Sequence, residues 1–265
     1  MRNDEFIDFL ESEQGLSSGT AHCYERMVRR MWPNDPTGWA SRYLRGKPQG
    51  TATVVKSAAR QWIRFQGKDP SKYVFKGGRG RTHSRAPQAL TDGQLRAYYK
   101  AASNVDDPVR TILMLLPRTG MRISEICAAK KSDVDKRKGR FALVFTGKRD
   151  KERRVYLSRP AEKILDTYLK RNQTNSDYLF PGRKKSHITP SRVRQVASEI
   201  GQQVGFRVNP HTLRHTYAST LHEQGVTLPV LKEAMGHESE RTTMRYIHPS
   251  DKELIEAADA AEKGR

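Results

Sequence analysis

Apolar residues recur at helical spacing through the first quarter of the chain, with polar residues between them. Two apolar faces are formed by Phe6, Ile7, Phe9 and Leu10 and by Tyr24, Met27, Val28 and Met31. The stretches TGWASRYLRG and TATVVKSAARQWIRFQG continue the pattern, and each closes on a glycine, as helix C-termini often do. We therefore expect a bundle of about four helices over residues 1–67.

Residues 68–88 lose this periodicity. The stretch GKDPSKYVFKGGRGRTHSRAPQALT holds two prolines, four glycines and six basic residues against one acidic residue. Such a composition is typical of a flexible, positively charged linker, and a long surface loop of a single domain is the alternative. The pattern favours the linker because helical spacing resumes directly after it, with Thr91 or Asp92 as the N-cap. A second domain is therefore expected over residues 89–265.

The second domain is expected to be mostly helical, with one β interlude. Two short runs, Phe141–Thr146 and Arg153–Leu157, flank a polar turn that contains Gly147. Together with the preceding SDVD they predict a small three-stranded antiparallel sheet. Helices are expected at Pro160–Arg171, Thr189–Gln203, Thr212–Gln224, Pro229–Met235, Arg241–Tyr246 and in the last sixteen residues. The predicted fold class is mainly α: a helical bundle followed by a mostly helical domain with one small sheet.

The charge balance points to a polyanionic partner. The 265 residues include 49 lysines and arginines against 29 acidic residues, a formal charge of +20. Because each neutralised phosphate releases condensed counterions, this excess favours nucleic acid, although a generally basic, ribosomal-type protein has a similar balance. The longest apolar run, Ile112–Leu116, is far too short to cross a bilayer. The N-terminus lacks the layout of a secretory signal, and Cys23 and Cys127 imply no disulfide framework, so a cytoplasmic location is expected.

Four places carry polar residues whose role is open from local pattern alone. Arg122 and Glu125, three residues apart, could be a structural ion pair or a phosphate clamp steadied by its carboxylate. Lys148 lies in the turn TGKRDKER, where a lysine is ordinarily a solvated charge. His211 and Arg214 share one face of an expected helix. His215 follows, and His211 with His215 has a spacing that would also suit zinc, but without a glutamate between them or a cysteine nearby.

The fourth place is GHESERTTMRYIH, where His237 precedes Tyr246 by nine residues. Taken together, the four places describe phosphodiester transfer. Such a reaction needs positioning and charge neutralisation, and two guanidiniums suit the non-bridging oxygens better than ammonium groups do. An imidazole can accept the phenol proton, and a lysine can protonate the departing sugar oxygen. A tyrosine with a free pKa near 10 needs such help to attack phosphorus.

The boxes TGMRISEI, GKRDKERRV, HTLRHTYAS and MGHESERTTMRYIH occur in the order and spacing of the tyrosine recombinases, the phage integrase, Xer and Cre family. The resemblance runs from about Leu90 to the end, and GLSSGTAHCYERMVRRM resembles that family's helical core-binding domain. By this resemblance the arginines that grip the scissile phosphate are Arg122 and Arg214, with Glu125 in support. It implies Lys148 as general acid, His211 as general base, His237 as transition-state hydrogen-bond donor and Tyr246 as nucleophile.

The same resemblance favours these residues over other tyrosines and lysines of the chain. Tyr217 stands where the family has an aromatic packing residue, Tyr156 lies in an expected strand, and Lys151 is the alternative lysine of the hairpin. The layout resembles the simple two-domain form, with no arm-binding domain before the bundle. The resemblance implies no metal or other cofactor, a partner of double-stranded DNA core sites, and a homotetramer on two duplexes joined through the C-terminal helix.

The expected function is site-specific DNA recombination through a 3′-phosphotyrosyl intermediate. A type IB topoisomerase would use the same residue types to nick and reseal one strand as a monomer. A DNA-binding protein with a decayed centre, acting as a repressor or architectural factor, is the alternative outside enzymology. The first alternative would relax plasmid without a recombination site, and the second would form no covalent adduct with DNA.

Overall fold

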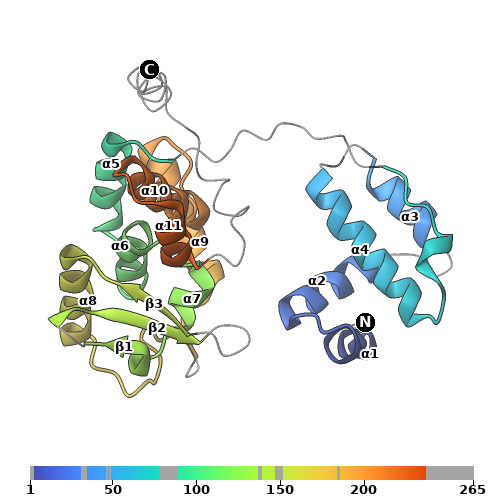
Figure 1. The fold of residues 1–265 in the computed structure, drawn as a ribbon, viewed down its shortest axis with the longest axis horizontal. Helices are drawn as coiled ribbons and strands as arrows, with labels where there is room; N and C mark the ends of the chain where they lie inside the picture. Colours follow the sequence, from blue (N-terminus) through green and yellow to red (C-terminus); the bar gives the residue numbers. More distant parts are fainter. Residues whose placement is uncertain are drawn as a thin grey trace, which may run out of the picture. The chain divides into compact units, whose positions relative to one another are not determined.

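The computed structural model describes residues 3–30, 35–45, 47, 49–77, 89–136, 139–146, 152–183 and 186–236. Its contacts divide the chain into two units, residues 1–84 and 85–265, which are described separately (Figure 1). Lys148, Lys151, His237, Tyr246 and the expected C-terminal helix lie outside the described residues.

The first unit is a helical bundle, as the apolar spacing predicts. Its helices are α1 (Asp4–Asp8), which continues as a π-helical stretch (Phe9–Glu13), α2 (Ser18–Val28), α3 (Pro36–Tyr43) and α4 (Gln49–Phe65). Helix starts follow local chemistry: Asn3 accepts a hydrogen bond from the backbone N–H of Phe6, and Asp35 accepts one from that of Gly38. The buried core is centred on Phe6, Leu10, Leu44 and Ile63.

The segment after α4 packs onto this bundle before the described residues stop at 77. A short 3-10 helix (Pro70–Lys72) is capped by Asp69, and the side chains of Tyr73 and Phe75 then join the bundle core. The guanidinium of Arg60 lies 5.4 Å from the ring centroid of Phe75, within cation–π range. The first part of the expected linker is therefore fixed to the bundle by two aromatic residues.

The second unit begins with three helices whose ends are set by particular residues. They are α5 (Asp92–Ala102), α6 (Val109–Thr119) and α7 (Ile123–Ala128). Of the two expected N-caps, Thr91 is the one that begins α5, in a reciprocal capping box with Gln94. Helix α6 carries the apolar run Ile112–Leu116 and ends at Gly120, which adopts left-handed backbone angles.

The expected three-stranded antiparallel sheet is confirmed, in the order β1–β2–β3. The strands are β1 (Val134–Asp135), β2 (Ala142–Thr146) and β3 (Glu152–Tyr156). Strands β2 and β3 form a hairpin that pairs Ala142 with Tyr156 and Thr146 with Glu152. Their bounds differ from expectation by one residue because alternation fixes the face of a strand more firmly than its ends.

Four helices complete the described part of the second unit. They are α8 (Arg159–Arg171), α9 (Pro190–Val204), α10 (Pro210–Glu223) and α11 (Leu228–Met235). Each has a proline in its first turn, where the missing N–H costs nothing. These spans agree with the expected helices to within two residues at each end, and the expected fold class is confirmed.

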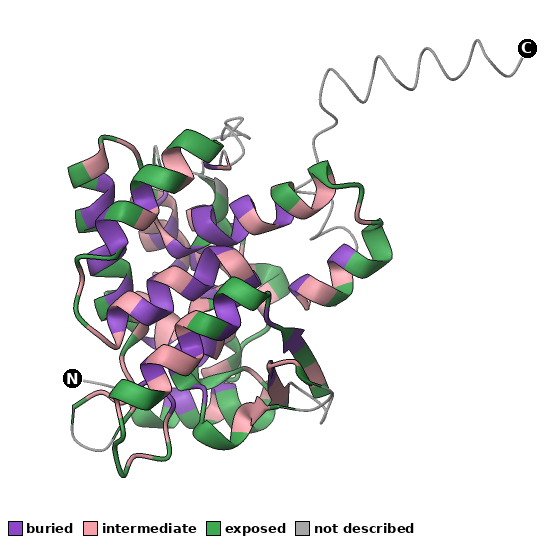
Figure 2. Ribbon diagram, turned by 90° about the vertical axis from the view of Figure 1, so that its left-hand side faces the viewer, coloured by how far each residue is buried: buried purple, intermediate pink, exposed green. Residues whose placement is uncertain are grey.

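A large core and a small one hold the second unit together. The large core gathers α5, α6, α8 and α9 with the inner face of the sheet, around Tyr98, Leu113, Leu165 and Phe180. The small core is separate from it and joins α11 to α10 through Ala218, Leu231 and Met235. Buried positions recur along the helices between exposed turns (Figure 2). In the described ranges no helix is long and apolar enough to span a membrane.

Candidate active site

Arg122 and Glu125 form the ion pair that their spacing predicts. Arg122 is the N-cap residue of α7, just after the left-handed turn at Gly120. Glu125 accepts hydrogen bonds from the backbone N–H of Arg122 at 2.8 Å and from its Nη1 at 2.7 Å. Burial raises the pKa of Glu125, but these hydrogen bonds and the charges of Arg153 and Arg122 outweigh it, so the pKa is lowered. The carboxylate is therefore held charged.

Arg214 is almost entirely buried, with 3% of its surface exposed. It lies on α10, which packs against α6 and α11. Its guanidinium donates to the carbonyl of Gly120 through Nη1 and to the carbonyl of Met235, 2.6 Å away, through Nη2. A buried guanidinium needs such acceptors because leaving its donors unpaired would cost several kilocalories per mole.

His211 lies one helical turn before Arg214 and is exposed, so its ring is accessible from solvent. His215 is buried, and its Nδ1 lies 3.0 Å from the Ser219 hydroxyl. No cluster of three or more histidine, cysteine, aspartate or glutamate side chains arranged for a metal occurs in the part of the chain that the structure describes.

The two competing tyrosines, Tyr217 and Tyr156, have different surroundings. Tyr217 packs against the small core between α10 and α11, and burial raises the pKa of its phenol. Tyr156 pairs with Ala142 in the sheet, and its side chain points outward, with 65% of its surface exposed.

Arg153 is a member of the site that the sequence analysis treated only as a strand residue. Its Nη1 donates to both carboxylate oxygens of Glu125, at 3.1 and 3.0 Å, and its Nη2 donates to the Ala234 carbonyl at 2.8 Å. A signal was available, because strand alternation places Arg153 on the same face as the buried Val155. An arginine on the inward face of a strand requires an acidic or carbonyl partner.

Three arginines from three different elements meet at the C-terminal end of α11. The carbonyls of Ala234, Met235 and Gly236 accept hydrogen bonds from Arg153, Arg214 and Arg122 respectively. The last carbonyls of a helix lack intrahelical donors and carry partial negative charge, which favours cations there. The three arginines thus converge on the point at which the chain continues to His237.

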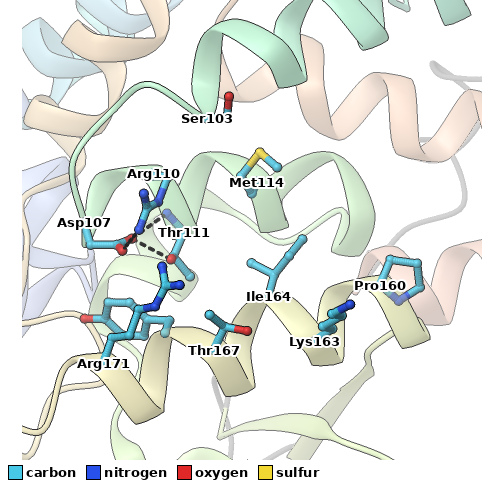
Figure 3. Close-up of a pocket in the computed structure, with 11 residues that line it drawn as sticks. Ser103, Asp107, Arg110, Thr111, Met114, Pro160, Lys163, Ile164, Thr167 and Arg171 are labelled. Carbon is cyan, nitrogen blue, oxygen red and sulfur yellow. Dashed lines mark hydrogen bonds and ion pairs between the residues drawn. The ribbon is translucent and has the colours of Figure 1, made fainter.

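A pocket of about 410 Å³ lies elsewhere in the second unit, between α6 and α8 (Figure 3). Met114 and Ile164 form apolar parts of its wall, and Asp107 pairs there with Arg110 and accepts a hydrogen bond from the Thr111 hydroxyl. The α6 residues Arg110, Thr111 and Met114 lie in the first half of the helix, whereas Arg122 follows its C-terminal end. Of the expected site residues that the structure describes, none lines this pocket.

Comparison with known proteins gives a consistent relationship. The model of the phage integrase family matches residues 88–253. Tyrosine recombinase XerA of Thermococcus kodakarensis is 30% identical, over 97% of this chain and 94% of its own. XerA of Pyrococcus horikoshii is 29% identical, over 97% and 92%.

Solved structures share the fold. The crystal structure of XerA recombinase matches with a TM-score of 0.58 at 24% identity, over 97% of this chain and 96% of that one. The Tn1549 transposon integrase in complex with circular intermediate DNA matches with a TM-score of 0.70 at 15% identity, over 98% and 100%. Since the family model spans more than half of the sequence, this chain belongs to the phage integrase family, the tyrosine recombinases.

Proposed function

We propose that this protein is a site-specific DNA recombinase that breaks and rejoins strands through a 3′-phosphotyrosyl link at Tyr246. The observation that carries the proposal is the convergence of Arg122 and Arg214 on two consecutive carbonyls, Gly236 and Met235. Two permanently charged forks from distant parts of the chain thus meet immediately before the segment that holds His237 and Tyr246.

The arginine pair supplies the binding chemistry for a phosphate. Carbonyl oxygens at a helix C-terminus carry partial negative charge, and the charged oxygens of a phosphodiester are stronger acceptors for the same guanidinium donors. Arg122 is the accessible member, with 46% of its side chain exposed, and Glu125 fixes its direction. Such fixed donors stabilise charge that develops on the non-bridging oxygens.

The remaining residues complete the proton transfers. The Tyr246 oxygen bonds to phosphorus and its proton passes to His211, while the bond from phosphorus to the 5′ oxygen breaks and Lys148 protonates that oxygen. His237 donates a hydrogen bond to the phosphoryl group. The products are a 3′-phosphotyrosine and a 5′-hydroxyl. A 5′-hydroxyl of a partner strand then attacks the phosphotyrosine and releases the phenol, and because the ester bond is conserved, rejoining needs no external energy source.

The first unit supplies the basic surface for duplex DNA in this proposal. Residues 1–67 would bind the core site, the basic segment that follows would join the units, and residues 89–265 would form the catalytic domain. Support comes from the exposed arginines in the described part of the bundle, which are Arg26, Arg29, Arg30, Arg42, Arg45, Arg60 and Arg64. Recombinases of the same fold have been solved with DNA, among them XerH bound to difH and λ integrase bound to a core site.

The proposed assembly is a homotetramer on two duplexes, joined through the C-terminal helix of each copy. The last segment places Leu254 and Ile255 among acidic and alanine residues, a thin apolar face that suits docking on a neighbour. Light scattering of the protein with and without core DNA would measure the assembly, and deletion of residues 250–265 is expected to abolish it.

A covalent trap tests the chemistry without a chosen target sequence. The protein is incubated with a pool of short nicked duplexes of randomised core sequence, so that the cleaved fragment diffuses away and the adduct persists. The expected result is a denaturation-resistant protein–DNA adduct with wild type and with Tyr156→Phe, the matched loss of an exposed phenol. Tyr246→Phe is expected to give none. An adduct in Tyr246→Phe, or none in wild type, would refute the proposal.

A further inference from the structure

Arg153 has a position that no other described residue of the site shares. It is the second residue of β3, directly after the hairpin segment in which Lys148 and Lys151 fall. Its side chain points inward, with 12% exposed, toward α7 and α11. It thereby connects three elements: the base of the hairpin, the carboxylate of Glu125, and the C-terminal end of α11.

The charge arrangement around Glu125 explains why two arginines are present. Two guanidiniums pair with the carboxylate of Glu125, and the charge of Glu233 acts on Arg153 as well. Arg122 is the exposed partner of Glu125, and Arg153 is the buried one. Arg153 therefore binds the Glu125 carboxylate from its buried side, and Arg122 stays available to bind an anion.

The contact with Gly236 shows how closely Arg153 is fitted. Gly236 ends α11 with a φ of 59°, and a Cβ at this position would lie 2.5 Å from Cζ and Nε of Arg153. The guanidinium thus lies against the bare Cα of the residue that precedes His237. Its Nε is buried and has no hydrogen-bond partner among the described residues, so the side chain is held by its two terminal nitrogens and by this packing.

The geometry points to Arg153 as a positioning residue of the reaction: it holds the base of the lysine-bearing hairpin in register with the arginine pair. It does so through Glu125 on one side and the Ala234 carbonyl on the other. This inference rests on the proposed function, and it assigns Arg153 no contact with DNA. A lysine could not replace it, because one ammonium cannot form the two-pronged contact that spans a carboxylate and a carbonyl.

The test is single-turnover cleavage of a nicked duplex that wild type has been shown to cleave. Arg153→Gln is expected to lower the rate about 100-fold, the size of effect that a displacement of about 1 Å produces. DNA affinity is expected to stay within about twofold of wild type, because Arg153 is assigned no phosphate contact. Arg154→Gln is the matched control, since the neighbouring guanidinium points outward to Glu152 and Asp135, and it should cleave at the wild-type rate.

A change of leaving group separates positioning from a general loss of structure. Replacing the 5′-bridging oxygen by sulfur gives a thiolate leaving group, which needs no proton from the hairpin lysine because a thiol has a pKa near 8.5. The deficit of Arg153→Gln is expected to shrink at least tenfold on this substrate. An equal deficit on both substrates, or a wild-type rate on the oxygen substrate, would overturn the assignment.

Arg153→Lys tests whether slow cleavage reflects a loss of positioning or a failure to fold. It retains a positive charge beside Glu125, so its melting temperature should stay near that of wild type while its cleavage of the oxygen substrate remains slow. Recovery of the full rate in Arg153→Lys would overturn the assignment, because the fork would then be dispensable. If the proposed function itself is wrong, the wild-type protein will give no Tyr246-dependent adduct on either substrate. That result differs from a failure of the Arg153 assignment, in which wild type still forms the adduct.

Discussion

Replacing Gly236 by alanine measures how firmly the arginine cluster fixes the end of α11. Gly236 has left-handed backbone angles, and an L-residue in that region costs about 1–2 kcal/mol. The new methyl group would also lie 2.5 Å from the Arg153 guanidinium, which must move. Moving it disrupts the hydrogen bond from Arg153 to the Ala234 carbonyl, and a bond with a charged donor contributes about 1.5–3 kcal/mol. The expected loss in unfolding free energy is therefore about 4 kcal/mol.

Gly205 provides a matched control for the backbone effect. It ends α9 with a φ of 78°, and a Cβ there would meet nothing within 4 Å. Gly205→Ala should lose only the backbone contribution, about 1–2 kcal/mol. For a unit the size of residues 85–265, these losses correspond to falls in melting temperature of about 11 °C for Gly236→Ala and about 4 °C for Gly205→Ala.

Differential scanning calorimetry of the full chain measures both variants. The transition of the second unit is identified by its shift in Gly205→Ala, since Gly205 lies in that unit. Adding Arg153→Gln to Gly236→Ala should cost less than it does in wild type, because the two changes disrupt one contact. Equal falls in melting temperature for the two alanine variants would refute the reasoning. They would mean that the Arg153 guanidinium can move away from the new methyl group at no cost in stability.

Three further predictions follow from the site and the bundle. Arg214→Lys should lower the single-turnover cleavage rate by about 100-fold or more, because a lone ammonium cannot replace a fork held by two carbonyls; a rate within threefold of wild type would contradict this. Because the pKa of folded Glu125 is lowered, its contribution to stability should be present above the ordinary glutamate pKa of about 4.3 and be lost as pH falls through the lower folded value. The difference in melting temperature between wild type and Glu125→Gln should therefore shrink in acid. A difference that grows in acid would contradict the lowered pKa of Glu125. Arg64→Ala in the bundle should reduce the slope of log affinity for duplex DNA against log salt concentration by about 0.9. An unchanged slope would mean that Arg64 does not contact a DNA phosphate.

Local chemistry was enough to predict much of the fold. The N-cap at Thr91 and the helices with a proline in the first turn each depend on residues within four positions of one another, and the apolar and polar runs on either side of a polar turn predicted strands β2 and β3. The packing of Tyr73 and Phe75 on the bundle was not predictable in this way. Those aromatics stand among glycines, lysines and prolines, and their partners are far away in the sequence.

For the site as well, contacts between residues near in sequence were predictable and contacts between distant residues were not. The pairing of Arg122 with Glu125 follows from helical spacing, and the resemblance in four sequence boxes supplies the other expected residues. Arg153 escaped because its partners, Glu125 and Ala234, are 28 and 81 residues away. The burial of Arg214 against the carbonyls of Gly120 and Met235 likewise depends on the meeting of α6, α10 and α11.

The small core between α10 and α11 gives the segment before His237 an unusual attachment. Its buried residues are Ala218, Leu231 and Met235, far fewer than in the main core, and hydrogen bonds from three arginines add to this packing. Few buried apolar side chains therefore hold this terminal portion to the rest of the domain, and it is expected to open more readily than the main core. Amide hydrogen exchange in Leu231–Met235 should therefore be faster than in Leu113–Leu116, so that the helix leading to the proposed nucleophile, Tyr246, is expected to adjust without disturbing the main core.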